Sequence, residues 1–328
     1  MRCPGDRFCR RSVCKSIDLS AAKQTTRQVS ASFTGKCSLM RFKQFLWFSL
    51  LLLRSPAVYP QGPLDGYLKG KGVLDFAPSF SFNSANRFDG AAGQHFSIPY
   101  RGSLLSLFAA YGLSERLDLV ANGAYVFTEG NSGLQDGGVY AKYRPLYKDV
   151  AGAGKLGLLL GWGLSFPLAD YEPLATAALG QKAVVAPVRI IAQWETPSGL
   201  FANITGGYNW RLDRLSSKDI AAIVAIRPDY QPVQPRDFFT ALFKIGFPAA
   251  HYYADAWLEW QQTRGGADFT PDVADLPQAY GVSYTQVGGT IYYSESGKNG
   301  FFLSGGYILG GRNTGRILRL TVGLVFRL

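Results

Sequence analysis

The sequence predicts an all-β protein, a single closed antiparallel transmembrane β-barrel of about 12 strands. Three observations predict this fold. The chain ends on a strand of alternating apolar and polar residues, similar segments of about 10–14 residues recur before it, and short and long connections alternate between them. About 10 or 14 strands are alternatives, because Lys218–Ile226 in the longest connection could pair as a further strand.

The basic character of the chain comes from its first 61 residues. All four cysteines lie in residues 1–39, which carry a net charge of +6, and residues 40–61 add +3. Only +2 of the total +11 therefore remains in residues 62–328. A basic nucleic-acid-binding protein is not supported, and we expect no nucleic-acid partner.

Residues 40–61 resemble a secretory signal peptide. Arg41 and Lys43 precede the apolar run Phe45–Leu53, and small residues follow at 55–57. The run is shorter than the roughly 20 residues that cross a bilayer as a helix. Residues 1–39 are either upstream sequence from a misassigned start or an organellar transit peptide. We favour the first interpretation because a secretory signal follows directly.

The remaining residues, 62–328, form the predicted barrel. In the segment 155–167, apolar side chains from Leu156 to Leu164 occupy the even positions, while glycines and Ser165 occupy most odd ones. Twelve such segments are predicted as strands: 72–83, 102–112, 117–128, 135–145, 155–167, 185–196, 199–212, 236–247, 251–264, 280–294, 299–310 and 315–328.

Connection lengths sort by strand number. Connections after even-numbered strands are short or medium, whereas four of those after odd-numbered strands are long, namely 84–101, 168–184, 213–235 and 265–279. Bacterial barrels have short periplasmic turns and longer extracellular loops. We therefore expect the bacterial outer membrane as the location and its lipid as a partner.

The last strand carries a second indication of this location. Thr321, Gly323, Phe326 and Leu328 resemble the C-terminal signal that directs barrels to the outer-membrane assembly machinery. We expect that machinery to be a partner of this chain.

The inward faces of the strands carry charges of both signs. A charge facing lipid at the midplane costs about 2–4 kcal/mol, so these side chains are expected inside. They form either an internal salt-bridge lattice or a narrow, weakly basic polar pore, and a barrel of 12 strands is compatible with both. In the pore, Lys142, Arg144, Arg189 and Arg211 would favour anions. The full set of candidate lumen-lining residues is Lys142, Arg144, Arg189, Glu195, Arg211, Lys244, Asp255 and Glu259.

Indications of catalysis are weak. His95-Phe96-Ser97 has the His-x-Ser spacing of an outer-membrane phospholipase, but no third group that would orient the pair is identified. A lipid hydrolase is therefore a minor alternative, and we expect no enzyme. The sequence contains no metal cluster, phosphate loop or nucleotide fingerprint, so no cofactor is expected.

Three segments resemble a family of outer-membrane barrels loosely described as transporters, some encoded in phenol-degradation operons. They are Tyr67–Gly72, Tyr111–Asp118 and Gly133–Tyr143. The resemblance covers most of residues 62–328 and implies fold and location, but offers no functional residue to carry over. We expect a pore or transporter for small solutes, hydrophobic ones among them. The alternative is a closed barrel with a surface-binding or structural role.

Overall fold

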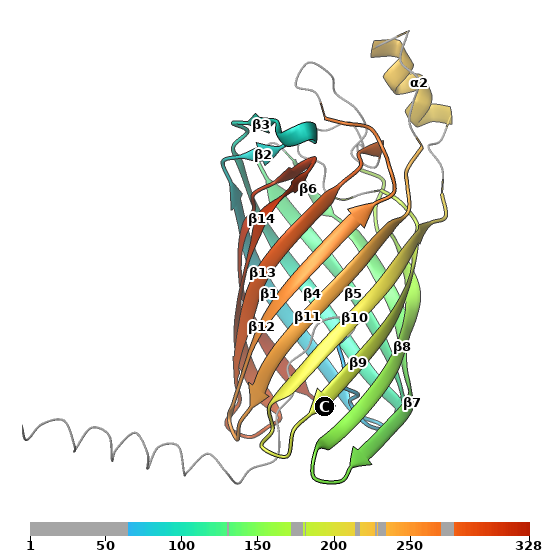
Figure 1. The fold of residues 1–328 in the computed structure, drawn as a ribbon. Coiled ribbons are helices and arrows are strands. Elements are labelled where there is room, and N and C mark those ends of the chain that lie inside the picture. Colours follow the sequence, from blue (N-terminus) through green and yellow to red (C-terminus); the bar gives the residue numbers. More distant parts are fainter. Residues whose placement is uncertain are drawn as a thin grey trace, which may run out of the picture. The chain divides into compact units, whose positions relative to one another are not determined.

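The computed structural model describes residues 65–129, 131–171, 180, 182–213, 217–226, 228, 234–269 and 279–328. The predicted extension 1–39 and the predicted signal peptide 40–61 lie outside these residues. Within the described residues, almost all regular structure is antiparallel strand (Figure 1).

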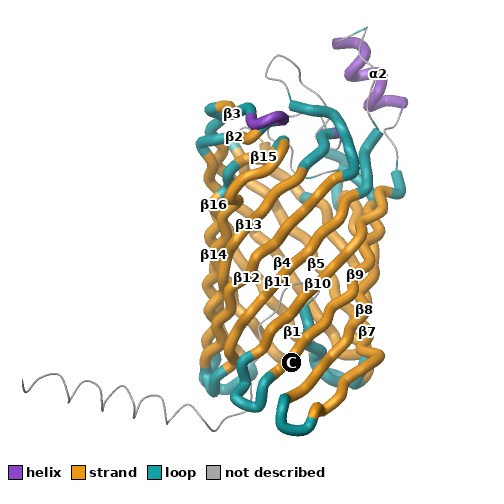
Figure 2. Tube along the Cα trace, in the orientation of Figure 1, coloured by secondary structure: helices purple, strands orange, loops and turns teal. Residues whose placement is uncertain are grey.

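Twelve long strands form one closed barrel, as the sequence predicts. The sheet order runs from β4 through β1 and β16 to β7 and β5, and β5 pairs again with β4 to complete the wall (Figure 2). Closure leaves none of the twelve wall strands as a free edge. The strands are β1 (Leu74–Ala85), β4 (Tyr100–Ser114), β5 (Leu117–Thr128), β7 (Asp136–Val150), β8 (Gly154–Pro167), β9 (Val185–Glu195), β10 (Phe201–Arg211), β11 (Phe238–Pro248), β12 (Tyr252–Thr263), β13 (Ser283–Tyr293), β14 (Asn299–Arg312) and β16 (Leu318–Arg327).

The two ends of the barrel differ in their connections. At the turn end, strands are joined by short turns, and the C-terminus lies there beside the start of β1 (Figure 1). At the loop end lie the long connections, including residues 86–99 and the described residues 264–269 and 279–282. This sorting agrees with the alternation of connection lengths in the sequence.

Alternating side chains divide the barrel into an outer and an inner face. On β16, Leu318, Leu320, Val322 and Leu324 are exposed on the outer face, while the residues between them point inward. The same alternation runs round the wall, where exposed aliphatic and aromatic side chains form an apolar outer surface. Such a surface suits the hydrocarbon of a bilayer, whereas buried polar and charged side chains, Asp75, Lys142 and Asn203 among them, lie inside the barrel.

Some elements differ from the sequence predictions. Strand β7 continues to Val150 because its pairing with β8 shifts at a bulge between Tyr143 and Leu146. The segment that could have been a further strand forms the helix α2 (Ser217–Ile226). The short strand β6 (Asn131–Leu134) extends the hairpin that begins in β5. Among the described helices, none has the length and apolar character needed to cross a membrane.

A small separate sheet lies at the loop end. It consists of β2 (Phe88–Asp89), β3 (His95–Phe96) and β15 (Thr314–Gly315), with the short helix η1 (Ala91–Gly93) between the first two. The rings of Phe88 and Phe96 pack against Phe269, with centroids 4.6 and 5.4 Å away. This contact joins the connection 86–99 to the connection that holds Phe269, and the pairing of β2 with β15 adds the loop between β14 and β16.

Candidate functional site: the lumen

The turn end of the lumen is occupied by the segment that precedes β1. Asp65 and Tyr67 are buried, and Lys142 of β7 donates hydrogen bonds to the Asp65 carboxylate (2.6 Å) and to the Tyr67 carbonyl. Gly66 lies so close to the wall that a Cβ there would approach the Gln193 Oε1 to 1.6 Å. A side chain at this position would have to displace the ends of the Gln193 and Asn203 side chains. The segment is therefore fitted into the barrel.

Ion pairs hold this segment and the closing strand together. Lys69 Nζ lies 3.4 Å from Asp75, while its backbone N–H donates to Asp118 (2.9 Å). Arg327 donates two hydrogen bonds to Asp75, at 2.8 and 2.9 Å. We call Asp65, Lys69, Asp75, Asp118, Lys142 and Arg327 the turn-end cluster. Its three acids and three bases compensate one another inside the barrel, as buried charges require.

An aromatic layer lies next to the turn-end cluster. The Tyr67 ring contacts Phe201 edge-on at a centroid distance of 5.5 Å, and Phe201 stacks on Tyr253 at 5.7 Å. Tyr292 belongs to the same buried group. These rings occupy part of the lumen beside β10, β12 and β13, which narrows the turn end further.

Beyond this layer the lumen opens into two adjoining cavities. The first, of about 540 Å³, lies beside the aromatic layer, and the second, of about 480 Å³, extends toward the loop end. Gln135, Asp136, Leu242 and Glu259 line both, so the two cavities adjoin. Polar side chains alternate with Trp257 and other apolar ones on their walls, so a solute would meet both kinds of surface.

Charges around these cavities balance. Six charged side chains line them, three basic and three acidic. They are Arg189, Lys244 and Arg319, and Asp136, Asp255 and Glu259. Lys244 and Asp255 form an ion pair at 3.2 Å. Asp136 accepts a hydrogen bond from Tyr171 (2.5 Å), a loop residue whose pKa is raised by burial and by this carboxylate. The phenol therefore remains a donor.

The candidate lumen residues from the sequence fall into three groups. Arg189, Lys244, Asp255 and Glu259 line the cavities, and Lys142 belongs to the turn-end cluster.

The remaining three lie outside the cavities. Arg144 lies at the rim of the turn end, where its guanidinium is 4.4 Å from the Tyr147 ring, and Glu195 accepts a hydrogen bond from Gln193 (2.6 Å). Arg211 lies toward the loop end with its guanidinium 5.6 Å from the Phe238 ring. Of the four basic residues of the proposed constriction, only Arg189 lines the cavities, so the structure does not gather them at one level of the lumen.

The four residues of the proposed assembly signal lie on both faces of β16. Thr321 faces the lumen and shares a hydrogen bond with Ser81 of β1 (2.8 Å), and Gly323 leaves space for the Phe302 ring. Phe326 and Leu328 are exposed on the outer surface. The backbone of Leu328 pairs in both directions with Leu74.

Sequence reasoning missed the inserted segment as a part of the site. Asp65, Tyr67 and Lys69 belong to no strand, so periodicity does not mark them. One indication was available, because Tyr67–Gly72 was among the segments that resemble other outer-membrane barrels. The structure brings Lys69, Asp118 and Lys142, one from each of the three resembling segments, into a single cluster.

His95 lies in the small loop-end sheet rather than beside a nucleophile. Its Nδ1 is 3.0 Å from Asp89, and Arg87 donates to its Nε2 at 2.6 Å. The nitrogen that would act as general base is therefore already occupied. No hydrogen bond joins His95 to Ser97 among the described residues.

No family model and no curated protein matches the chain. Among solved structures, it is similar to the COG4313 outer membrane channel from Pseudomonas putida F1, with 15% identity and a TM-score of 0.61 over 82% of this chain and 100% of that one. This likeness shows the fold. The NanC porin is less similar, with a TM-score of 0.47 and 11% identity over 78% of this chain and 100% of that one.

Proposed function

We propose that the chain is an outer-membrane channel for small solutes that carry both polar and apolar groups. The observation that carries the proposal is the pair of adjoining cavities in the lumen, which together offer charged, neutral polar and aromatic surface. Under this proposal the turn end faces the periplasm and the loop end faces outward, as in bacterial barrels.

The inserted segment gives this channel a restriction at its periplasmic end. Residues 65–72 and the aromatic layer occupy the lumen there. The conductance of the resting barrel is therefore small, and displacement of the inserted segment increases this conductance. The similar solved structure is described as a channel, which agrees with the proposal.

The test is the conductance of single barrels in planar bilayers. The chain is expressed in a Gram-negative host, purified from the outer membrane and compared with a variant lacking residues 65–71. We expect a small conductance from the intact barrel and one several-fold larger from the variant, because the deletion removes the inserted segment and the Tyr67 ring from the turn end.

A control shows that the variant is still a barrel. Heat-modifiable mobility on a denaturing gel should be retained by both proteins. If neither folded protein conducts ions, the channel proposal is wrong, and the closed barrel with a surface-binding role takes its place.

A further inference from the structure

The cavities have an arrangement of charge that goes beyond a polar lining. Asp136 on β7, Arg189 on β9, Glu259 on β12 and Arg319 on β16 all line them. Apart from Lys244 and Asp255, which pair with each other, the charges that line the cavities alternate in sign in the order of strands round the barrel: negative, positive, negative, positive. We call these four residues the central ring. Its net charge is zero, so it favours neither anions nor cations as such.

The basic members of the central ring are held by neutral partners. Arg189 donates to the Asn209 Oδ1 (2.8 Å) and to the Val188 carbonyl (3.1 Å), and Arg319 donates to the Asn83 Oδ1 (2.9 Å). In the described part of the chain, neither guanidinium has a carboxylate within 4.0 Å. A guanidinium has five N–H donors, so each retains donors for a ligand.

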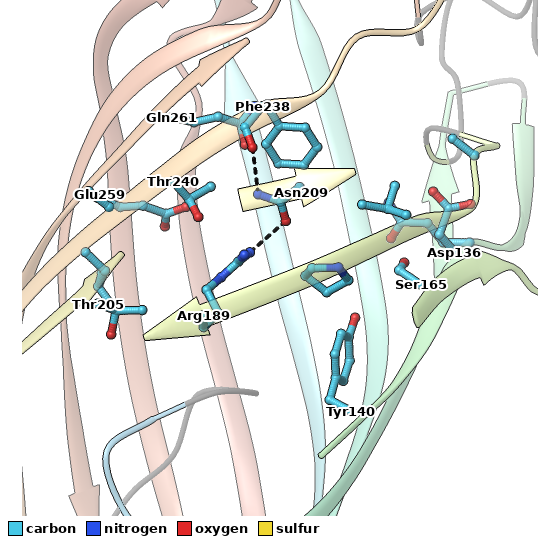
Figure 3. A pocket seen from close by; sticks show the side chains of 16 residues that line it. Asp136, Tyr140, Ser165, Arg189, Thr205, Asn209, Phe238, Thr240, Glu259 and Gln261 are labelled. Carbon is cyan, nitrogen blue, oxygen red and sulfur yellow. Dashed lines mark hydrogen bonds between the residues drawn. The ribbon is translucent and has the colours of Figure 1, made fainter. Parts of the chain in front are cut away.

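Glu259 is held in the same way. Its Oε1 accepts a hydrogen bond from the Tyr284 hydroxyl (3.0 Å), and no basic side chain lies within ion-pair distance among the described residues. It lies within electrostatic reach of Arg189 and lines the same cavity of about 480 Å³ (Figure 3). A fixed cation and a fixed anion thus border one space without neutralising each other.

The position of Arg189 is built into the wall. Its cross-strand partners on the two neighbouring strands are Gly161 and Gly207. A Cβ at position 207 would lie 2.4 Å from the Arg189 Cδ and 2.5 Å from its Nη1. The side chain therefore lies flat against the backbone of β10, and Asn209 fixes its end. The guanidinium is pre-organised at the edge of the cavity, which reduces the entropy lost when a ligand binds.

Apolar surface lies next to these charges. Trp257, Phe108 and Phe302 line the adjoining cavity, whose wall also contains Glu259. A ligand held at the central ring can therefore place an apolar group against these aromatic rings. This combination narrows the class of solute.

We propose that Arg189 and Glu259 form a binding site for small zwitterionic solutes with an apolar side group. A carboxylate binds Arg189 and an ammonium binds Glu259. A simple anion would meet the carboxylates of Glu259 and Asp136, and a simple cation would meet Arg189, so each is disfavoured relative to a molecule that carries both charges. The inference rests on the proposed function, since it concerns what enters the same lumen.

Equilibrium binding to the purified barrel tests the site without requiring transport. Three probes share a phenyl-containing skeleton: phenylalanine carries both charges, 3-phenylpropionate lacks the ammonium and phenethylamine lacks the carboxylate. Calorimetric titration of the intact protein should show phenylalanine binding at least about tenfold more tightly than either, because each lost charged contact weakens binding by about this factor.

Two variants assign the charges. In Arg189→Met, the affinity for phenylalanine should fall to that for phenethylamine. In Glu259→Gln, which retains a group for Tyr284, it should fall to that for 3-phenylpropionate. Arg144→Met is the matched control. Because Arg144 lies at the rim, this substitution should leave all three affinities unchanged.

Three results would overturn the inference: no binding of phenylalanine, equal affinity for the three probes, or tightest binding of 3-phenylpropionate. If Arg189→Met does not give a heat-modifiable barrel, the Glu259→Gln variant and the affinities of the unaltered protein for the three probes still test the proposed site. Potassium chloride conductance of the same preparation separates the two proposals. A conducting barrel without discrimination contradicts only this site, and a binding barrel without conductance contradicts only the channel.

Discussion

The two halves of the lumen use charge differently. In the turn-end cluster, the lysines and Arg327 lie within 2.6 to 3.4 Å of a carboxylate, and the groups are mostly inaccessible to solvent. In the central ring, Arg189 and Glu259 are hydrogen-bonded to neutral groups and border open cavities. The same residue types therefore hold the barrel together at one end and remain available to a solute at the other.

The largest effect is expected at the seam of the turn end. Deleting Phe326–Leu328 removes the backbone pairing of Leu328 with Leu74 and the Arg327–Asp75 ion pair, together with the residues that we propose the assembly machinery recognises. We expect the chain to remain in the periplasm and be degraded, as measured by fractionation and immunoblotting. Arg189→Met, at the central ring, should insert normally. Insertion of the truncated chain would contradict the proposal.

The next largest effect is expected on the free energy of unfolding of the barrel. Lys142→Met leaves the buried carboxylates of Asp65 and Asp118 without their cation, which should lower the free energy of unfolding by about 3–5 kcal/mol. Arg189→Met loses only contacts to neutral acceptors and should cost less than about 1.5 kcal/mol. Urea titration followed by tryptophan fluorescence measures both. Equal losses would show that the two halves do not differ in this way.

Ion selectivity should change most when a charge of the central ring is altered. The lining charges of the cavities balance, so the reversal potential in a potassium chloride gradient should show little preference in the unaltered channel. Arg189→Glu replaces a positive by a negative charge and should produce cation preference without loss of the barrel. Arg144→Glu at the rim is the control and should change selectivity less. A strong anion preference of the unaltered channel would argue against the balanced ring.

The smallest effect is expected from pH at the loop-end sheet. Asp89 is buried, which by itself raises its pKa, but hydrogen bonds from Arg316 and Arg87 outweigh burial and hold the pKa below its ordinary 3.8. The folded sheet therefore binds fewer protons than the unfolded one, so its stability is present above about pH 3.8 and falls as the pH drops through the lowered pKa. Amide exchange in β2 and β15 should rise there, and Asp89→Asn should abolish the dependence while leaving exchange in the barrel strands unchanged.

The sequence predicts the barrel well because alternation and connection length are local properties. All twelve strands lie where the pattern places them, and the faces of β8 and β12 are as expected. The end of β7 was missed because the bulge after Tyr143 depends on its pairing with β8. Lys218–Ile226 was a possible strand, yet outside the wall it has no partner strand and forms the helix α2.

The functional surface could be predicted only in part. The inward positions of Arg189 and Glu259 follow from alternation. That these two border the cavities while Lys142 is paired with buried carboxylates does not. That separation depends on which carboxylates lie nearby, and Asp65 comes from a segment with no periodicity. The place of Arg189 depends on Gly207 across the sheet, which is a property of register rather than of either strand alone.

The seam between β1 and β16 also acts as a check on folding errors. Arg319 and Arg327 face inward only because Asp75 pairs with Arg327 and Asn83 with Arg319. Closure with a slip of one residue would turn both arginines toward lipid. Both lie near the ends of β16, where facing lipid costs up to about 1 kcal/mol each, and the contact of Arg327 with Asp75 would be lost as well. The bilayer itself thus selects against misaligned closure. The register between β1 and β16 is therefore set by the surrounding lipid as well as by contacts within the chain.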